Sequence, residues 1–321
     1  MTSTIGPNIL AAADVARLSG RVAAMEVMRE AFRSLGSGTA VQPPQTLTLL
    51  PQGAGDFITY LGVLAEARVF GAKLSPYLSR PGGGLVTAWT VLMSMESGLP
   101  ILLCDSKQLT VERTAATTAL AVDLLAPQSA ARLAVIGAGP VAKAHIRHIR
   151  RLRRWRHIRI YSRNVARSPE GREVIALDDR IQLETTLHRA VDDADVVLLC
   201  TSSGTAILDP MNLRKPALIT SISTNAPKAH EVPPASLRDM DVYCDYRATT
   251  PSSAGEMQIA GAEHGWSAAT VVGDLPELTA GSGALPSYAR HVFFRSIGLG
   301  LEDIAMAHAL LRLVQSDSDS N

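Results

Sequence analysis

The sequence predicts an α/β protein in which one domain is inserted into another. Between residues 45 and 103, short strand-like runs are separated by turns rich in Gly and Pro, which is typical of an α+β domain. From residue 132 onward, apolar strands alternate with helices, which indicates a parallel sheet covered on both faces. A last apolar helix is expected to pack back on the N-terminal part. We therefore expect a discontinuous α+β domain over residues 1–118 plus 295–321, and an inserted α/β domain over residues 119–294.

Composition and charge limit the class of protein. Of the 321 residues, 46% are hydrophobic and 19% are charged, and the net charge is +1. This balance is typical of a globular chain and favours neither nucleic acid nor a membrane surface as a partner. No apolar run is long enough to span a membrane, and we expect no signal peptide at the N-terminus. We expect a cytoplasmic protein with reduced thiols at Cys104, Cys200 and Cys244, and a disordered tail from about Gln315.

Two helices and four strands are expected in the N-terminal part. Residues 21–35 place apolar side chains at helical spacing, which predicts an amphipathic helix. Strands are expected at the apolar runs TLTLL, FITYLGV, RVFGAKL and ILLCD. A second helix is expected to start near Thr110, which is a suitable N-cap residue, and to continue to Pro127.

The inserted domain alternates strand and helix. Strands are expected at RLAVI, HIRIYS, IQLE, DVVLLC, ALITSIS and DVYCDY, and the helix GPVAKAHIRHIRRL joins the first two. The alternation fades after Tyr246. The final helix is expected from about Ser296 to Val314. One stripe of this helix carries Ile297, Leu301, Ile304, Ala305 and His308.

The first strand of the inserted domain runs into a glycine-rich turn that predicts a dinucleotide site. Gly137, Gly139 and Ala142 form G-x-G-x-x-A, with Pro140 and Val141 at the start of the following helix. The first glycine allows the tight turn, and the second lets the backbone approach a pyrophosphate at the helix N-terminus. Because strand, turn and helix occur in the required order, we expect a Rossmann domain that binds NAD(P)(H).

Polar residues at two later strand ends bear on the choice of cofactor. The second strand ends at Ser162, Arg163 and Asn164, where NAD-specific sites usually carry an acid. These donors suit a 2′-phosphate, so NADP(H) is preferred and NAD(H) remains possible. After the fourth strand, Thr201 and Ser202 either line the cofactor crevice or cap the strand end.

Three cations are candidates for the substrate site. Arg113 lies in the first turn of the helix that we expect to start at Thr110, where a positive charge opposes the helix dipole. An anion bound there would make the charge favourable, which suggests a carboxylate site; a surface salt bridge is the alternative. Lys73, in the apolar run RVFGAKL, is either an exposed edge residue or a group held for chemistry, and Arg80 follows in the next loop.

Four motifs together carry a family resemblance over nearly the whole chain. FGAKL, SGLPILLCDSKQLTVERTAATTALAVDLLAP, VIGAGPVAKAHI and FFRSIGLGLEDIAMA occur in this order, and the chain resembles the ornithine cyclodeaminase and mu-crystallin family. The resemblance implies a Rossmann domain within a substrate-binding and dimerisation domain, and hence a homodimer. It also implies that Lys73 and Arg113 hold the substrate carboxylate. Asp303 matches a family position and either orders the active-site end of this domain or is a carboxylate on the helix surface. We also expect Thr114 and Ser223 to bind the cofactor.

Two positions depart from the family pattern. Gln45 replaces an arginine that helps to hold the carboxylate, and Asn225 stands where cyclodeaminases carry an aspartate. An amide neither takes nor gives a proton near neutral pH, which disfavours a lyase and favours simple hydride transfer. Lys73, His230 and bulk water remain candidates for the proton donor.

The leading hypothesis is an NAD(P)H-dependent reductase or dehydrogenase acting on the C–N bond of an α-imino or α-amino acid. An ornithine cyclodeaminase-like lyase that recycles NAD internally is one alternative, and a non-catalytic NADP-binding protein is another. A basic stretch from Lys143 to Arg159 lacks aromatic residues beyond Trp155, so a nucleic-acid surface is not expected. His145 and His148 have no third ligand at helical spacing, so we expect no metal site.

Overall fold

The computed structural model describes residues 6–163, 165, 168–223 and 228–319. Contacts within the chain divide it into two compact units. The first unit comprises residues 1–113 and 299–321, and the second comprises residues 114–298. These bounds differ by a few residues at each junction from the domain bounds expected from the sequence.

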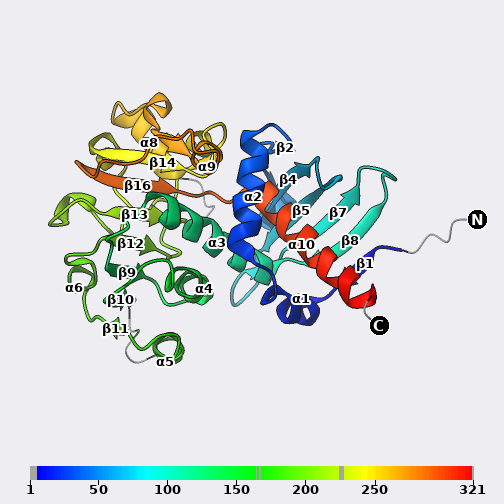
Figure 1. The fold of residues 1–321 in the computed structure, drawn as a ribbon, viewed down its shortest axis with the longest axis horizontal. Coiled ribbons are helices and arrows are strands. Elements are labelled where there is room, and N and C mark those ends of the chain that lie inside the picture. Colours follow the sequence, from blue (N-terminus) through cyan, green and yellow to red (C-terminus); the bar gives the residue numbers. More distant parts are fainter. Residues whose placement is uncertain (1–5, 164, 166–167, 224–227, 320–321) are drawn as a thin grey trace, which may run out of the picture. The chain divides into compact units, whose positions relative to one another are not determined.

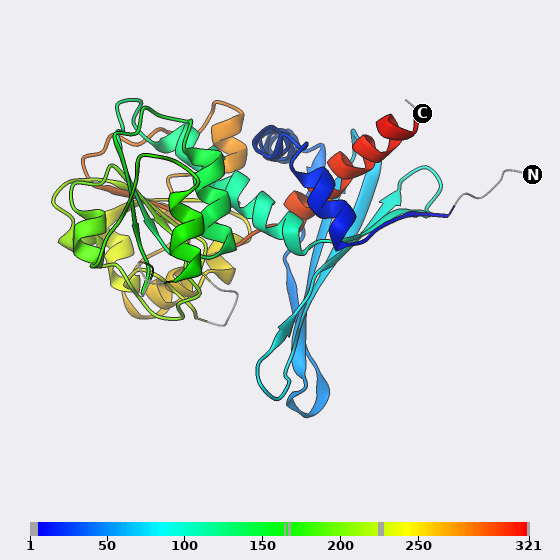
Figure 2. The same ribbon diagram turned by 90° about the horizontal axis from the view of Figure 1, so that it is seen from below.

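The first unit is built on one mixed sheet. Its strands follow the order β1-β8-β7-β5-β4-β2, while β3 pairs with β4 and β6 with β5. Among the described strands, β1 and β8 pair in parallel and the other neighbours pair antiparallel. Figure 2 shows these strands in blue and cyan. Their bounds are β1 Asn8–Leu10, β2 Ala40–Val41, β3 Thr46–Leu49, β4 Gly55–Leu64, β5 Val69–Leu78, β6 Leu85–Val86, β7 Trp89–Ser94 and β8 Pro100–Asp105.

Helix α10 (Gly300–Asp319) lies directly on this sheet because glycines leave room for it. The other helices of the unit are α1 (Ala12–Ser19) and α2 (Ala24–Gly36), and both also contact α10. Gly62 and Gly71 are paired across β4 and β5. A Cβ on Gly62 would lie 2.8 Å from the Leu301 Cα, and one on Gly300 would lie 2.3 Å from the Leu61 carbonyl oxygen. The N-terminal turn of α10 therefore rests on the backbone of the β4–β5 hairpin.

The second unit contains the parallel sheet that the alternation predicted. Its order is β11-β10-β9-β12-β13-β16-β14-β15, with every pair parallel. Figure 1 shows the helices of this unit in green and orange around the strands. Its strands are β9 Arg132–Ile136, β10 His157–Tyr161, β11 Ile181–Leu183, β12 Val196–Leu199, β13 Leu218–Ser221, β14 Met240–Cys244, β15 Gly273–Asp274 and β16 His291–Arg295. Its helices are α4 Pro140–Ile149, α5 Pro169–Ile175, α6 Leu187–Val191, α7 Thr250–Ser253, α8 Gly255–Glu263 and α9 Leu275–Thr279. Helix α3 (Lys107–Leu125) begins in the first unit and ends in the second.

Several elements differ from the sequence prediction, and α1, β1, β2, β6 and β7 were not expected. Helix α3 begins at Lys107 rather than near Thr110, because the Asp105 carboxylate accepts the Lys107 N–H at 3.0 Å. Strand β16 was missed, although it lies between β13 and β14 with its side chains largely buried. Its apolar run is only three residues long, and it follows a loop rich in Gly, Ser and Pro.

The last helix is also displaced relative to the prediction. It begins at Gly300 rather than Ser296, because Asp245 accepts the N–H groups of Ile297 and Gly298 at 2.7 and 3.1 Å. It continues to Asp319, so the expectation of a disordered tail is wrong for residues 315–319. An ion pair of 2.6 Å between Arg21 and Asp317 holds this end of the helix to the first unit.

Within the described part of the chain, no helix has both the length and the apolar character needed to cross a membrane.

Candidate functional site

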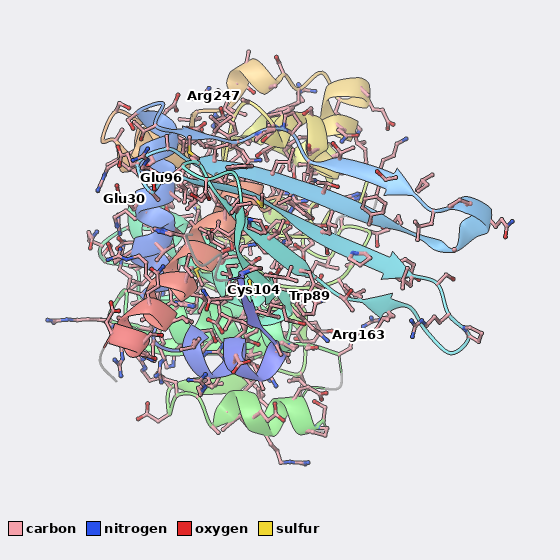
Figure 3. The ribbon with its side chains drawn as sticks, turned by 90° about the vertical axis from the view of Figure 1, so that its right-hand side faces the viewer. Glu30, Trp89, Glu96, Cys104, Arg163 and Arg247 are labelled. Atoms are coloured by element: carbon pink, nitrogen blue, oxygen red, sulfur yellow. The ribbon has the colours of Figure 1, made fainter. Side chains whose placement is uncertain are left out.

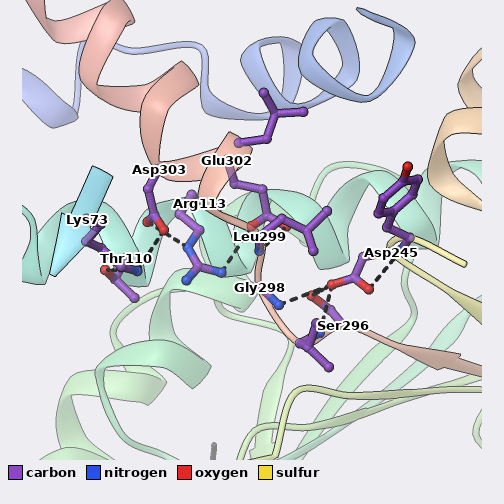
Figure 4. Close-up of polar contacts among 12 residues, drawn as sticks. Lys73, Thr110, Arg113, Asp245, Ser296, Gly298, Leu299, Glu302 and Asp303 are labelled. Atoms are coloured by element: carbon purple, nitrogen blue, oxygen red, sulfur yellow. Dashed lines mark hydrogen bonds and ion pairs between the residues drawn. The ribbon is translucent and has the colours of Figure 1, made fainter. Parts of the chain in front are cut away.

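Four charged residues meet in the interior of the first unit. Lys73 from β5, Arg113 from α3, and Glu302 and Asp303 from α10 are each at most 4% exposed (Figure 4). The Lys73 ammonium lies 2.8 Å from Asp303, and the Arg113 guanidinium lies 3.1 Å from both Glu302 and Asp303. We call these four residues the ion cluster. It contains two cations and two anions, which makes the burial of charge possible.

Strand register and helix packing explain how these residues meet. Tyr60, Lys73 and Thr90 are direct neighbours on β4, β5 and β7, and all three are buried. The Lys73 ammonium lies 4.2 Å from the centre of the Tyr60 ring, which is a cation–π contact. It also donates to the Thr110 hydroxyl of α3 at 3.4 Å. Lys73 is thus neither an exposed edge residue nor a surface lysine.

The ionisation of Lys73 is altered by its surroundings. Burial lowers the pKa of Lys73 to about 8; the Arg113 guanidinium acts in the same direction, and Asp303 opposes both. Burial likewise raises the pKa of Tyr60 well above its ordinary value, so its hydroxyl stays protonated. Lys73 is therefore an amine that can exchange a proton near neutral pH.

Arg113 lies deeper in its helix than the sequence predicted. Because α3 begins at Lys107, Arg113 lies in the second turn and not the first. Its counter-ions come from the protein itself, since Nε donates to Asp303 and Nη1 donates to Glu302. The carboxylates of the ion cluster therefore occupy Nε and Nη1 of Arg113.

The other expected substrate residues lie beside strands of the same sheet. Gln45 precedes β3 and is partly buried, and its amide oxygen is buried without a hydrogen-bond partner among the described residues. Arg80 is exposed in the loop after β5. A groove of about 320 Å³ also exists in the first unit, between α2, α10 and the β4–β5 turn. Its lining includes Glu30 (Figure 3) and His308, but no member of the ion cluster.

The glycine-rich turn in the second unit has the geometry that a dinucleotide needs. Gly137 has a φ of +126°, and a Cβ there would lie 2.4 Å from the Cys200 carbonyl oxygen, so only glycine fits. Gly139 has open space where its Cβ would lie, and Pro140 opens α4 beside it. The turn therefore exposes backbone at a helix N-terminus, as a pyrophosphate requires. Val141 is half-buried in the first turn of the same helix.

Residues after β10 are those expected to contact the ribose 2′-phosphate of NADP(H). Ser162 is partly buried, and the Arg163 side chain is exposed (Figure 3). Asn164, the third residue of this group, lies outside the described residues. Neither of these two positions carries a carboxylate. Thr114, expected to contact the cofactor, is half-buried in α3.

Polar groups also gather at the carboxyl ends of β12 and β13. Thr201 and Ser223 are both held by the buried carboxylate of Glu231, whereas Ser202 is exposed. His230 is partly buried and its Nδ1 lies 2.8 Å from the Lys228 carbonyl oxygen. Asn225 lies outside the described residues.

Sequence reasoning missed three residues of these sites, namely Tyr60, Glu302 and Glu231. Tyr60 and Glu302 lie in apolar contexts and gave no spacing signal, because they meet Lys73 and Arg113 only after folding. A buried acid beside a run of Ser and Thr strand ends was the signal that could have identified Glu231.

Comparison with known proteins decides the family. The model of the ornithine cyclodeaminase/mu-crystallin family matches residues 6–317. The chain belongs to this family. The resemblance inferred from the four sequence motifs is thereby confirmed.

Individual relatives cover almost the whole chain. The NAD(P)H-dependent anabolic L-arginine dehydrogenase DauB of Pseudomonas aeruginosa is 54% identical over 314 residues, which are 98% of this chain and 99% of the relative. The iminosuccinate reductase of Paracoccus denitrificans is 26% identical over 96% of each chain. Its crystal structure with NAD⁺ has a TM-score of 0.88 at 24% identity over 97% of each chain. An archaeal alanine dehydrogenase dimer with bound NAD has a TM-score of 0.85 at 20% identity over 97% of each chain.

These relatives confirm the predicted fold and class of activity. The protein is an oxidoreductase that uses a nicotinamide cofactor and acts on the C–N bond of an α-amino or α-imino acid. The Rossmann domain inserted in a discontinuous α+β domain is likewise confirmed.

Proposed function

We propose that this protein is an L-arginine dehydrogenase that works in the direction of amino-acid synthesis. Its identity of 54% over 98% of the chain to the P. aeruginosa enzyme is the observation that carries this proposal. In the synthetic direction, a 2-oxo acid condenses with ammonia and loses water, and the resulting imine accepts a hydride at carbon and a proton at nitrogen. The cofactor supplies the hydride.

Each unit has its own part in this reaction. The second unit holds the cofactor through the exposed backbone at Gly139 and the N-terminus of α4. In the first unit, the Arg113 guanidinium and the Lys73 ammonium bind the substrate carboxylate, with Asp303 fixing both cations. Gln45 and Arg80 complete the contacts with the substrate.

Lys73 is the proposed proton donor to the imine nitrogen. Its pKa, lowered to about 8 by burial, keeps it protonated at neutral pH yet able to release a proton. His230 is the second candidate, and its Nε2 is the nitrogen that does not face the Lys228 carbonyl. The transfer leaves a neutral amine, which takes up a second proton from water, and the carboxylates of Asp303 and Glu302 favour the resulting ammonium group of the product.

The sheet of the first unit supports assembly into a homodimer. On the face opposite α10, Leu61, Phe70, Leu74 and Trp89 are all 37–47% exposed (Figure 3 labels Trp89). A contiguous apolar sheet face of this kind is typical of a protein–protein interface. Burial raises the pKa of all three cysteine thiols, which supports unreactive, reduced thiols in the cytoplasm.

The decisive experiment follows NADPH and NADH consumption by the purified protein with ammonia and a panel of 2-oxo acids. The 2-oxo acid of arginine should be reduced with the highest kcat/KM, and the product should be L-arginine by chiral chromatography. If a different 2-oxo acid is reduced with a higher kcat/KM, the proposed substrate is wrong. Ammonia release from ornithine without net cofactor consumption would instead identify a cyclodeaminase, and binding without turnover would identify a binding protein.

A further inference from the structure

A fully buried carboxylate in the second unit joins the ends of two strands. Glu231 is 0% exposed, and one of its oxygens accepts the N–H and the hydroxyl of Thr201 at 3.0 and 2.7 Å. The other oxygen accepts the Ser221 hydroxyl at 2.8 Å and the Ser223 N–H at 3.0 Å. Its own carbonyl accepts two further N–H groups, from residues 207 and 208. These four donors satisfy both oxygens of the buried carboxylate.

The groups that Glu231 holds lie at the cofactor edge of the sheet. Thr201 follows β12 and Ser223 follows β13, and the carboxyl ends of such strands form the crevice in which a dinucleotide binds. Between β12 and Thr201 lies Cys200, whose carbonyl oxygen lies where a Cβ on Gly137 would be. Glu231 is thus connected through two residues to the glycine-rich turn.

The strand order assigns this part of the crevice to one half of the cofactor. The order β11-β10-β9-β12-β13 is that of two mononucleotide-binding halves that meet between β9 and β12. The half with β10 carries the position that contacts the adenosine ribose. The half with β12 and β13 therefore serves the nicotinamide nucleotide.

Ser223 shows the signs of a residue held ready for a ligand. Its φ is +42°, a left-handed conformation that residues other than glycine rarely adopt. Its hydroxyl is buried and has no hydrogen-bond partner in the described part of the chain. A strained backbone and an unpaired buried hydroxyl are both unfavourable unless a bound group uses them.

We propose that Glu231 is a positioning residue for the nicotinamide half of the cofactor. Its carboxylate holds Ser223 in the left-handed conformation, so that the Ser223 hydroxyl can bond to the nicotinamide nucleotide, and it fixes Thr201 beside it. The inference rests on the proposed function only in that the second unit binds a nicotinamide cofactor.

The experiment compares two ligands that differ only by the nicotinamide. NADPH and 2′-phospho-ADP-ribose are titrated calorimetrically into the wild type, Glu231→Gln and Ser223→Ala; NADH and ADP-ribose replace them if the wild type prefers that pair. Glu231→Gln should weaken NADPH binding by about tenfold or more, because an amide cannot accept all four donors. Binding of 2′-phospho-ADP-ribose should stay within about twofold of the wild type. Ser223→Ala should also weaken NADPH binding relative to 2′-phospho-ADP-ribose binding. It should do so without lowering the melting temperature.

A matched control separates positioning from general stability. Asp195 is a carboxylate that accepts the N–H groups of Ala131 and Arg132 at 2.8 and 2.9 Å, at the amino end of β9. Asp195→Asn should lower the melting temperature and leave the ratio of the two affinities unchanged. Equal weakening of both ligands by Glu231→Gln would overturn the proposal, and so would no weakening of either.

Two further outcomes complete the test. If Glu231→Gln does not fold, Ser223→Ala decides alone, and an unchanged ratio in that variant overturns the proposal. If the wild type binds neither ligand pair, the proposed function fails, which is distinct from a failure of this inference.

Discussion

Arg113 tests whether the ion cluster serves stability and substrate binding separately. Arg113→Met removes the cation that Glu302 contacts within the ion cluster, and removal of one member of a buried ion pair destabilises by about 3–5 kcal/mol. The second change Glu302→Gln removes the carboxylate of that pair, so the double variant should regain much of the lost stability. It should not regain kcat/KM, because the lost charge-assisted contact with the substrate carboxylate costs about 2–4 kcal/mol of transition-state stabilisation. Thermal melts and steady-state kinetics of both variants provide the measurement. Recovery of kcat/KM in the double variant would show that Arg113 does not hold the substrate.

The lowered pKa of Lys73 predicts how kcat/KM depends on pH. Its pKa is lowered by burial from 10.5 to about 8, so the protonated form is lost from the folded protein as the pH rises through about 8. If Lys73 donates the proton, kcat/KM for imine reduction should fall above that pH. Lys73→Arg, which stays charged, should abolish the fall while reducing the rate. A profile of kcat/KM from pH 6 to 10 is the measurement, and an unchanged fall in the arginine variant would assign the proton to another group.

The lowered pKa of Lys73 should also make the folded protein more stable as the pH rises. Between about pH 8 and 10.5 the unfolded chain binds the Lys73 proton and the folded chain does not. The unfolding free energy contributed by Lys73 therefore rises with pH across that window. Urea unfolding at pH 8 and pH 10 should show this rise in the wild type relative to Lys73→Met.

Arg163 determines the predicted preference for NADPH. Its exposed guanidinium and the Ser162 hydroxyl stand where an acid would select NADH. Arg163→Ala should remove a preference of about 1–3 kcal/mol, the scale of a hydrogen bond to a charged group. The dissociation constants of NADPH and NADH for both proteins are compared. A wild type that binds NADH more tightly contradicts the prediction.

At the scale of single residues, the sequence singled out three of the four charges of the ion cluster and missed Glu302. Lys73, Arg113 and Asp303 were identified because a charge in an apolar run calls for an explanation. The contact of Arg113 with Glu302 spans 189 residues of sequence. No local pattern contains such a contact, so the protein's own counter-ion was missed and a ligand anion was expected in its place.

At the scale of elements, the two glycines of the fingerprint should behave differently. Gly139 has a φ of −72° and open space at its Cβ, so Gly139→Asp should fold normally. Its negative charge beside the pyrophosphate should weaken cofactor binding more than about 100-fold. Gly137→Ala should instead lower stability by about 1–3 kcal/mol, because of its positive φ and the nearby Cys200 carbonyl. Calorimetric titration and thermal melts of both variants are the measurement. Tight cofactor binding by Gly139→Asp would contradict the assignment of the fingerprint.

Element boundaries were predicted only where local signals determine them. The strand, turn and helix around Gly137 follow from apolar runs and glycine spacing, and they are found as expected. The start of α10 was misplaced because Asp245, more than 50 residues earlier, takes the N–H groups that would have opened the helix. Strand β16 was missed because its neighbours β13 and β14, and not its own composition, make it a central strand.

At the scale of the molecule, the sequence predicts two units because the pattern of apolar residues changes along the chain. Strand-like runs give way to alternating strands and helices from residue 132, and the last helix returns to the first unit. The last helix closes the first unit because the paired Gly62 and Gly71 admit it to the sheet, a close approach that no composition measure reports. The opposite face of the same sheet remains apolar and exposed in the single chain. It requires an explanation at the level of assembly.

The last prediction concerns that face. Leu74, on β5, alternates with Lys73 and points to the face opposite α10, where it lies beside Trp89 in the strand register. If two copies bury this face, Leu74→Glu places a charge in an apolar interface and should convert a dimer to a monomer. Light scattering after gel filtration measures the mass. Ile175→Glu is the matched control, because Ile175 is also an exposed apolar residue, at 48%, but lies on α5 in the second unit. A wild type that elutes as a monomer would contradict the dimer, and a Leu74→Glu variant that remains dimeric would place the interface elsewhere. Because the helix-facing side of β5 carries Lys73, loss of the dimer should also raise KM for the substrate while the affinity for the cofactor is unchanged.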